Sequence, residues 1–257
     1  MSRGGFVAAC PAKINLSLRV LGKREDGYHE LRTEFQAIDL HDILEVRPGR
    51  DLRLTVEGAS GLSGGADNLV LRAAVALRRV VHGRSGATMR LRKNIPVGGG
   101  LGGGSSDAAG ALLALERLWG VRPSPSERLA IARDLGADVP FFLVGGRALG
   151  RGRGDRLTAI ESIEQLAVLI GLPPFGVSTA EVFAGWSARL TPPGNGVSVP
   201  RLSGSGTQAP GELVGGRNDL EQVAFARWPV LGRFRDELRR CGARVALLSG
   251  SGSTVFG

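Results

Sequence analysis

Residues 96–120 read PVGGGLGGGSSDAAGALLALERLWG, a glycine-rich loop that runs directly into a predicted amphipathic helix. Six of the seven residues from Gly98 to Gly104 are glycine. The apolar side chains that follow recur at the spacing of one helical face, at Ala108, Leu112, Leu115 and Trp119. Gly120 is suited to end this helix, because glycine accepts the left-handed conformation of a C-terminal cap.

The glycine loop has the properties of a phosphate-binding site. Glycine lets a ligand approach the main chain without a Cβ in the way, and a helix N-terminus offers an anion free N–H groups and a positive dipole end. Ser105 and Ser106 add hydroxyl groups that can bind a phosphate, or an Mg²⁺ ion that bridges phosphates. A flexible linker is the alternative, but linkers do not usually open a patterned helix.

Two other nucleotide-binding patterns fit this loop poorly. Gly98, Gly100 and Gly103 satisfy GxGxxG, yet the preceding MRLRKNIPV carries charge on alternate positions, unlike the buried strand of a dinucleotide-binding unit. A Walker A loop requires a lysine after the glycines, and none follows.

The segments upstream of the loop predict a mixture of strands and helices. AKINLSLRV at 12–20 alternates apolar and polar residues, which is typical of a half-buried strand. Further strands are predicted by TEFQAIDL, DILEVRP, DLRLTVEG and TMRLRKNIPV, and a helix by NLVLRAAVALRRVV.

The segments downstream continue the mixture and suggest a second domain. SPSE at 124–127 is a capping box before another helix, and RGRGDR at 151–156 predicts a hinge between domains 1–156 and 157–257. Beyond it we expect a strand in IEQLAVLIGLP, a helix in STAEVFAGW, a loop over 191–216 and a helix broken near Pro229. ARVALLSGSGSTVFG at the end predicts two strands around a Gly/Ser turn.

Composition excludes several classes of protein. Glycine and proline make 53 of the 257 residues, below the roughly 25–30% that marks low-complexity disorder. Two cysteines, Cys10 and Cys241, are too few for a disulfide framework, and three scattered histidines form no metal-binding motif. No stretch approaches 18 consecutive apolar residues, so we expect no membrane partner.

The net charge of +9 comes from 33 basic and 24 acidic residues, and thirty of the basic residues are arginine. These arginines are spread along the chain without a basic block, so we predict no nucleic-acid partner. The simplest interpretation is a solvated arginine-rich surface, with attraction of an anionic small substrate as the alternative.

Three separated segments resemble the GHMP kinase superfamily: PAKINLSL at 11–18, PVGGGLGGGSSDAAG at 96–110 and LLSGSGSTVFG at 247–257. Within it, the sequence is most similar to the kinases of the non-mevalonate isoprenoid pathway that act on a cytidine-diphosphate-linked methylerythritol. DGYHEL at 26–31 carries this narrower resemblance, followed in the expected order by GADVPFF, GVSTAEVF and NDLE. The resemblance covers essentially the whole chain.

The resemblance implies an α+β fold of two lobes with the site between them. The N-terminal lobe would resemble ribosomal protein S5 domain 2, and the C-terminal lobe would be ferredoxin-like. Members of the family continue past the segment that matches LLSGSGSTVFG with a further helix and strand. This sequence ends at Gly257, so we expect a truncated or abbreviated C-terminal lobe.

The resemblance also implies a reaction and its residues: transfer of the ATP γ-phosphate, with Mg²⁺, to the tertiary 2-hydroxyl group of the cytidylated alcohol. Lys13 and Asp138 match the catalytic pair. The positions that match the ATP phosphate loop are Pro96, Val97, Gly98, Gly99, Gly100, Leu101, Gly102, Gly103, Gly104, Ser105 and Ser106. The positions that match the substrate site are Asn15 at the reacting end, Tyr28 and His29 at the cytosine, and Phe183 as a second aromatic wall.

From the residues alone, other interpretations stay open. Lys13 reads equally well as a solvated lysine of the strand, Asp138 as a helix cap before Pro140, and Tyr28 and His29 as turn residues. A kinase of another small alcohol, such as homoserine or mevalonate, is one alternative function. A basic RNA-binding module built on the S5-like lobe is another. We expect a monomer or homodimer in the bacterial cytoplasm.

Overall fold

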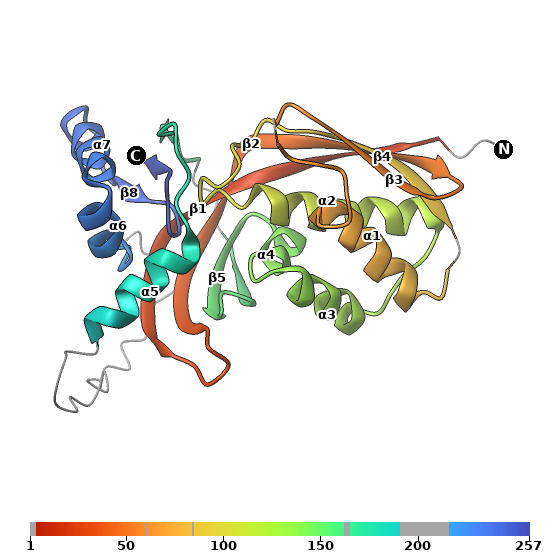
Figure 1. Ribbon diagram of the computed structural model, residues 1–257, viewed down its shortest axis with the longest axis horizontal. Helices are drawn as coiled ribbons and strands as arrows, with labels where there is room; N and C mark the ends of the chain where they lie inside the picture. The colour runs from red at the N-terminus through yellow and green to blue at the C-terminus, as the bar shows by residue number, and fades with distance from the viewer. Residues whose placement is uncertain (1–3, 60, 84, 162–164, 191–215) are drawn as a thin grey trace.

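The computed structural model describes residues 4–59, 61–83, 85–161, 165–190 and 216–257, which form an α+β fold with two lobes (Figure 1). The loop predicted at 191–216 lies outside the described residues except for Gly216. The strands of the larger sheet are β1 (Phe6–Lys23), β2 (His29–Gly49), β3 (Leu52–Glu57), β4 (Gly86–Arg92), β5 (Arg147–Gly152) and β6 (Arg156–Ile160). Their order is β3-β4-β2-β5-β6, with β1 paired to β2 off this path.

Strands β1 and β2 form a long antiparallel pair that reaches from one lobe into the other (Figure 1). Strand β1 confirms the predicted strand and extends it at both ends. The two strands expected at 33–40 and 42–48 are instead one strand, β2. The register jumps between the Pro11–His41 and Ala12–Ile38 pairs, so the extra residues Asp39 and Leu40 form a bulge where a break was expected.

The RGRGDR segment at 151–156 is the tight turn of the β5–β6 hairpin, not the predicted hinge. The larger sheet continues to Ile160 at the end of β6. The division of the chain into domains 1–156 and 157–257 stays a prediction.

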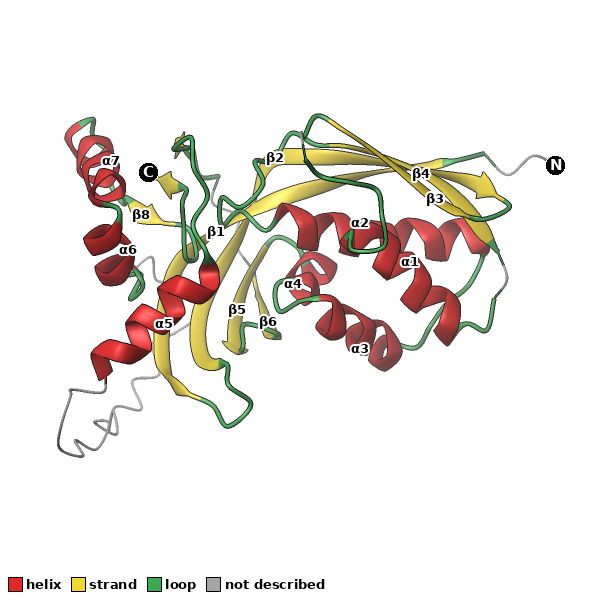
Figure 2. Cartoon of the chain, viewed as in Figure 1, coloured by secondary structure: helices red, strands yellow, loops and turns green. Residues whose placement is uncertain are grey.

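Four helices cover one face of the larger sheet, as Figure 2 shows. They are α1 (Leu69–Val80), α2 (Gly103–Trp119), α3 (Pro125–Leu135) and α4 (Val139–Val144). The predicted cap of α2 is confirmed, since Gly120 has φ 68°. The predicted capping box of α3 is also confirmed: the Glu127 N–H donates to Ser124 Oγ at 3.2 Å, and the Ser124 N–H donates to Glu127 Oε2 at 2.7 Å.

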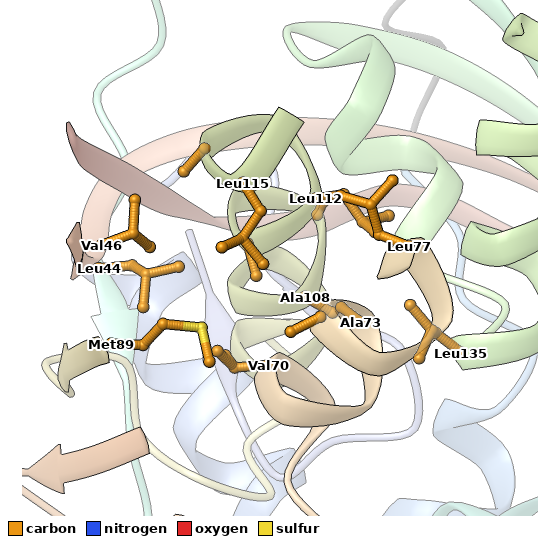
Figure 3. Packing of buried hydrophobic residues seen from close by; sticks show 14 of the residues in the cluster. Leu44, Val46, Val70, Ala73, Leu77, Met89, Ala108, Leu112, Leu115 and Leu135 are labelled. Atoms are coloured by element: carbon orange, nitrogen blue, oxygen red, sulfur yellow. The ribbon is translucent and has the colours of Figure 1, made fainter. Parts of the chain in front are cut away.

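The core between these helices and the sheet explains why the glycine loop is held in place (Figure 3). It joins buried residues from β1, β2 and β4 and from all four helices, among them Leu44, Val46, Met89, Val70, Leu77, Leu112, Leu115 and Leu135. Burying apolar side chains of this size contributes about 1.5–3 kcal/mol each. Helix α2, which begins at the end of the glycine loop, is thereby fixed against the sheet.

The C-terminal lobe packs helices α5 (Thr179–Leu190), α6 (Glu221–Arg227) and α7 (Pro229–Arg240) around a small antiparallel sheet. Its strands are β7 (Ile170–Gly171), β8 (Leu247–Leu248) and β9 (Val255–Phe256), in the order β7-β9-β8. The predicted helix break at Pro229 is confirmed. None of the helices within the described residues is long and apolar enough to cross a membrane.

Candidate active site

A cleft of about 890 Å³ lies between the glycine loop, β1, β2 and α5. It brings together residues that are far apart in the sequence. Of the residues predicted to form the site, those that line it are Lys13, Asn15, Tyr28, His29, Gly100, Gly102, Ser105, Asp138 and Phe183.

The rest of the predicted loop residues are not part of the described lining of this cleft. Leu101 is buried in the core beneath the loop. The Ser106 side chain is also buried and borders a separate cavity of about 280 Å³ beside Cys10 and Gly110. Ser105 is therefore the serine of the pair that faces the cleft. The remaining residues do not line it: Pro96, Val97, Gly98, Gly99, Gly103 and Gly104.

Lys13 is a buried cation at the wall of the cleft, with 3% of its surface exposed, and not a solvated strand lysine. Its Nζ donates hydrogen bonds to Asn15 Oδ1 and to the Gly100 carbonyl oxygen, both at 2.7 Å, and lies 3.9 Å from Asp138 Oδ2. Burial lowers the pKa of the Lys13 ammonium, and the Asp138 carboxylate opposes that shift. The Lys13 side chain thus links the first strand to the glycine loop.

Asp138 occupies the N-cap position of α4, but its side chain does not cap the helix. Its backbone is in the right-handed helical region and its side chain makes no capping hydrogen bond. The carboxylate is 36% exposed and faces the cleft beside Lys13. Asp138 thus holds the predicted cap position, but its carboxylate makes no capping bond and is accessible to a ligand.

Asn15 is held rigidly by a residue that sequence analysis missed. Its Nδ2 donates to Thr33 Oγ1 at 2.8 Å, and Thr33 Oγ1 in turn donates to the Ser17 carbonyl oxygen at 2.7 Å. This chain of hydrogen bonds fixes the Asn15 amide with its oxygen toward Lys13 Nζ. A threonine opposite the first strand gives no sequence signal, because its role depends on the register of β1 and β2.

His29 belongs to a cluster of aromatic rings on β2 and α5. Its ring stacks on Phe183 with centroids 4.9 Å apart, and the edge of Trp186 lies against it at 5.7 Å. His29 Nε2 is 2.7 Å from Ser187 Oγ. Burial, followed by the nearby Lys23, lowers the pKa of the His29 imidazole, so the neutral ring is favoured.

Tyr28 is 54% exposed at the rim of the cleft. The Arg153 guanidinium lies over its ring at 4.9 Å, and Asp155 Oδ1 accepts a hydrogen bond of 3.1 Å from the Arg153 backbone N–H. The two predicted aromatic walls, Tyr28 and Phe183, thus each have one ring face covered by a neighbour. Arg153 was not predicted, since it lies in the segment taken for a hinge.

The glycine loop has a backbone that other residues would strain. Gly98, Gly100 and Gly102 all have φ between 72° and 76°. A second glycine motif, at 249–254, packs directly on this loop. The Thr254 N–H donates to the Gly99 carbonyl oxygen at 3.1 Å, and Ser249 Oγ donates to the Gly100 carbonyl oxygen, also at 3.1 Å. The two glycine motifs therefore form one unit, which spans both lobes.

Asn218 supports the glycine motif at 249–254, a role that the sequence did not predict. Its Nδ2 donates to the carbonyl oxygens of Leu248 and Gly250 at 2.8 and 2.7 Å, and its Oδ1 accepts from the Leu220 N–H at 3.0 Å. The side chain is almost fully buried. The amide thus fixes the turn that carries Gly250 into the cleft.

We expect Asn218→Ala to lower the free energy of unfolding by about 2–4 kcal/mol, because it leaves several buried backbone groups without partners. Urea unfolding followed by circular dichroism measures this. Asn94→Ala is the matched control, since Asn94 Nδ2 makes a single exposed bond, 2.8 Å to the His41 carbonyl oxygen. Equal losses in the two variants would contradict the role of Asn218.

The fold and the site together define a GHMP kinase, and a family model described as the GHMP kinases N terminal domain matches residues 68–146. The chain is 47% identical over 255 residues to 4-diphosphocytidyl-2-C-methyl-D-erythritol kinase of Pelotomaculum thermopropionicum, covering 98% of this chain and 88% of the relative. It is 44% identical to the enzyme of that name from Citrifermentans bemidjiense, covering 96% of this chain and 87% of the relative. The chain belongs to the 4-diphosphocytidyl-2-C-methyl-D-erythritol kinase family.

Solved structures agree with this assignment. A crystal structure of 4-(cytidine 5'-diphospho)-2C-methyl-D-erythritol kinase superposes with a TM-score of 0.73 at 38% identity, covering 98% of this chain and 89% of that one. Homoserine kinase from Cytophaga hutchinsonii superposes with a TM-score of 0.64 at 20% identity, covering 100% and 85%. The second likeness shows the shared fold alone.

Proposed function

We propose that this chain is a kinase that transfers the γ-phosphoryl group of ATP to the 2-hydroxyl group of 4-diphosphocytidyl-2-C-methyl-D-erythritol. One observation carries the proposal: a single cleft joins Lys13 and Asp138, the glycine loop and the aromatic cluster around His29. Family membership supports both the use of ATP and a small-molecule substrate. A cytidylated alcohol has a base and a reacting hydroxyl group, and the cleft has the aromatic cluster for the first and the Asp138 carboxylate for the second.

The glycine loop from Pro96 to Ser106 is our proposed site for the phosphates of ATP. Positive φ angles at Gly98, Gly100 and Gly102 leave the main chain open to close approach, and α2 begins at Gly103 with the positive end of its dipole beside the loop. The Gly100 carbonyl oxygen is turned away from an anion, because it accepts from Lys13 Nζ and Ser249 Oγ.

Asp138 and Lys13 are our proposed catalytic pair. The Asp138 carboxylate faces the cleft and can accept the proton of the attacking hydroxyl group. Lys13 lies beside it and offsets negative charge as the phosphoryl group is transferred. Phosphoryl transfer through a loose transition state depends mainly on positioning and charge, so a weak base held in place suffices. Asn15, fixed through Thr33, would orient the reacting hydroxyl group.

The oxygen donors of this cleft suit a magnesium ion that is also bound by the phosphates of ATP. Within the described residues, no group of three or more His, Cys, Asp or Glu side chains could hold a metal ion. Mg²⁺ prefers oxygen ligands and is commonly bound through substrate phosphates with few protein groups. The Ser105 hydroxyl faces the cleft and would hold the ion together with the phosphate oxygens of ATP. The ion would supply charge neutralisation at the transferred phosphoryl group.

The aromatic cluster is our proposed site for the cytosine, with Tyr28 and Phe183 as stacking surfaces and His29 as a polar partner. Stacking of a base on an aromatic ring is worth about 1–3 kcal/mol. The stack of His29 on Phe183 means that loss of His29 also removes the support of the Phe183 ring.

We therefore expect His29→Ala to raise the KM for the cytidylated substrate by about tenfold and to leave the KM for ATP unchanged. Steady-state kinetics with each substrate varied in turn measures both constants. His41→Ala is the control, because His41 does not line the cleft. An equal rise in both constants for His29→Ala would contradict the proposed cytosine site.

A coupled assay of ADP release, run with and without 4-diphosphocytidyl-2-C-methyl-D-erythritol, tests the proposed function. We expect turnover that depends on this alcohol and is absent with homoserine or mevalonate. Turnover with either of those alcohols instead would identify a kinase of different specificity. RNA binding with a steep salt dependence and no phosphoryl transfer would support the nucleic-acid alternative.

We also propose that the reaction takes place in the cytoplasm of a bacterium. The similar proteins come from bacteria, and both Cys10 and Cys241 are free thiols, which suits a reducing compartment.

A further inference from the structure

Three buried charged side chains lie together behind the glycine loop. Lys93 Nζ donates one hydrogen bond to Asp107 Oδ2 at 2.7 Å and another to Asp42 Oδ2. Their side chains are 3% (Lys93), 3% (Asp107) and 0% (Asp42) exposed. We refer to Lys93, Asp42 and Asp107 as the buried charge cluster. None of its members lines the cleft.

The buried charge cluster connects the two ends of the glycine loop. At the entrance, Asp42 Oδ1 accepts a hydrogen bond of 2.8 Å from the Ile95 N–H, one residue before Pro96, and another from the Asn94 N–H. At the exit, Asp107 lies near the start of α2. Lys93 Nζ bridges the two carboxylates, so it sets the distance between the residues on either side of the loop.

The first residue of α2 sits directly over the Lys93 ammonium. A Cβ placed on Gly103 would be 3.2 Å from Lys93 Nζ and 3.0 Å from Ile95 Cγ2. The N-terminus of α2 therefore packs against the buried charge cluster. Lys13 contacts the loop from the other side, through the Gly100 carbonyl oxygen. Two of the three lysines in the chain thus hold the glycine loop: Lys13 bonds to Gly100 within it, and Lys93 bonds to Asp107, the residue after Ser106.

Stability alone does not account for such a cluster. Removing three charges from water costs more than filling the same space with apolar side chains, and replacing buried ion groups by packed hydrophobic residues is often neutral or stabilising. Burial raises the pKa of the Asp107 carboxyl to about 7; the neighbouring Asp42 carboxylate adds to this rise and Lys93 opposes it. Directional bonds between charged groups do, however, fix geometry more tightly than apolar contacts.

We propose that the buried charge cluster positions the glycine loop for ATP, with Lys93 as the positioning residue that holds the loop entrance and the N-terminus of α2 at the spacing the triphosphate requires. This inference rests on the proposed function, because it assumes that the loop binds ATP. It predicts a role in ATP affinity for side chains that never touch the nucleotide.

The test compares Lys93→Met and Asp107→Asn with the control Arg147→Met. Arg147 is also buried and pairs with Glu34, but it joins β2 to β5 away from the glycine loop. The Kd of ATP with Mg²⁺ is measured by calorimetry without the second substrate, together with the melting temperature and both KM values. Asp107→Asn keeps the shape of the side chain and an oxygen for Lys93, so it reports on the cluster even if Lys93→Met does not fold.

We expect Lys93→Met to raise the Kd of ATP by about 10- to 100-fold, the scale of effect that small misplacements of a site produce. Asp107→Asn should raise it in the same direction by a smaller factor, and both should leave the KM for the cytidylated substrate unchanged. Arg147→Met should lower the melting temperature without changing the Kd of ATP. The proposal is overturned if both cluster variants bind ATP as the Arg147→Met control does.

Failure of the proposed function would look different. If the unmodified protein binds ATP but transfers no phosphate to the cytidylated alcohol, the assigned reaction is wrong, whereas the ATP affinities of the variants still decide the role of the cluster.

Discussion

Asp138→Asn should lower kcat by about 10²- to 10⁴-fold, the range over which a positioned general base contributes to catalysis. The substitution keeps the shape of the side chain and removes its ability to accept the proton of the substrate hydroxyl group. Because the Asp138 side chain makes no capping bond to α4, its loss should not unfold that helix. The carboxylate meets Lys13 at 3.9 Å, beyond hydrogen-bond length, so the Lys13 bonds to Asn15 and Gly100 should persist.

Single-turnover kinetics and calorimetry separate this effect from a loss of binding. The Kd of ATP should stay within about twofold of the unmodified value, since Asp138 is not part of the glycine loop. Asp134→Asn is the matched control, an exposed aspartate at the end of α3 that does not line the cleft. Near-normal turnover of Asp138→Asn would remove this carboxylate from the mechanism.

Gly100→Ala should abolish measurable ATP binding, and we expect it to be the most damaging single substitution in the loop. Gly100 has φ 76°, which costs an alanine about 1–2 kcal/mol. An added Cβ would also lie 2.4 Å from the Ser249 carbonyl oxygen and 2.8 Å from that of Gly252. These are backbone atoms, so the two glycine motifs would have to separate. The Gly100 carbonyl oxygen, which accepts from Lys13 and Ser249, would move with them.

Gly242→Ala distinguishes backbone strain from this collision. Gly242 has φ 97°, and a Cβ there would meet nothing within 4 Å. The control should therefore lose about 1–2 kcal/mol of stability and keep the ATP affinity of the unmodified protein. Thermal melting and calorimetry on both variants measure the two effects. Equal ATP affinity in the two variants would show that the contact of Gly100 with the glycine motif at 249–254 is dispensable.

Local sequence patterns predicted the elements whose boundaries depend on neighbouring residues. The start of α3 followed from a capping box, the end of α2 from Gly120 and the break between α6 and α7 from Pro229. Strand β2 was expected in two pieces because an extra pair of residues interrupts its alternation, and only pairing with β1 shows that they form a bulge. The RGRGDR turn was misread for a similar reason, since glycine and arginine suit a hairpin turn as well as a hinge.

The site residues divide along the same line. The glycine content of the loop predicted a phosphate-binding site, and the resemblance to GHMP kinases pointed to Lys13 and Asp138. Thr33 and the buried charge cluster gave no local signal, because each acts through partners on other elements, and Asn218 was noted only as the first residue of NDLE, without a role. The scarcity of lysine was the one available clue to Lys93, and it becomes informative only when Lys93 is seen beneath Gly103.

Strand β1 has a consequence for the order in which the protein can fold during synthesis. Its first half enters the core beneath α2 through Cys10, whereas Leu18 and Val20 belong to the core of the C-terminal lobe. The Leu18 N–H donates to the Arg217 carbonyl oxygen at 2.7 Å, and the Asp219 N–H donates to that of Leu18 at 2.9 Å. The C-terminal end of β1 therefore meets these partners only after about 200 further residues have been synthesised. At 5–20 residues per second this takes roughly 10–40 s. During that interval Leu18 and Val20 lack the C-terminal side chains that bury them in the folded protein.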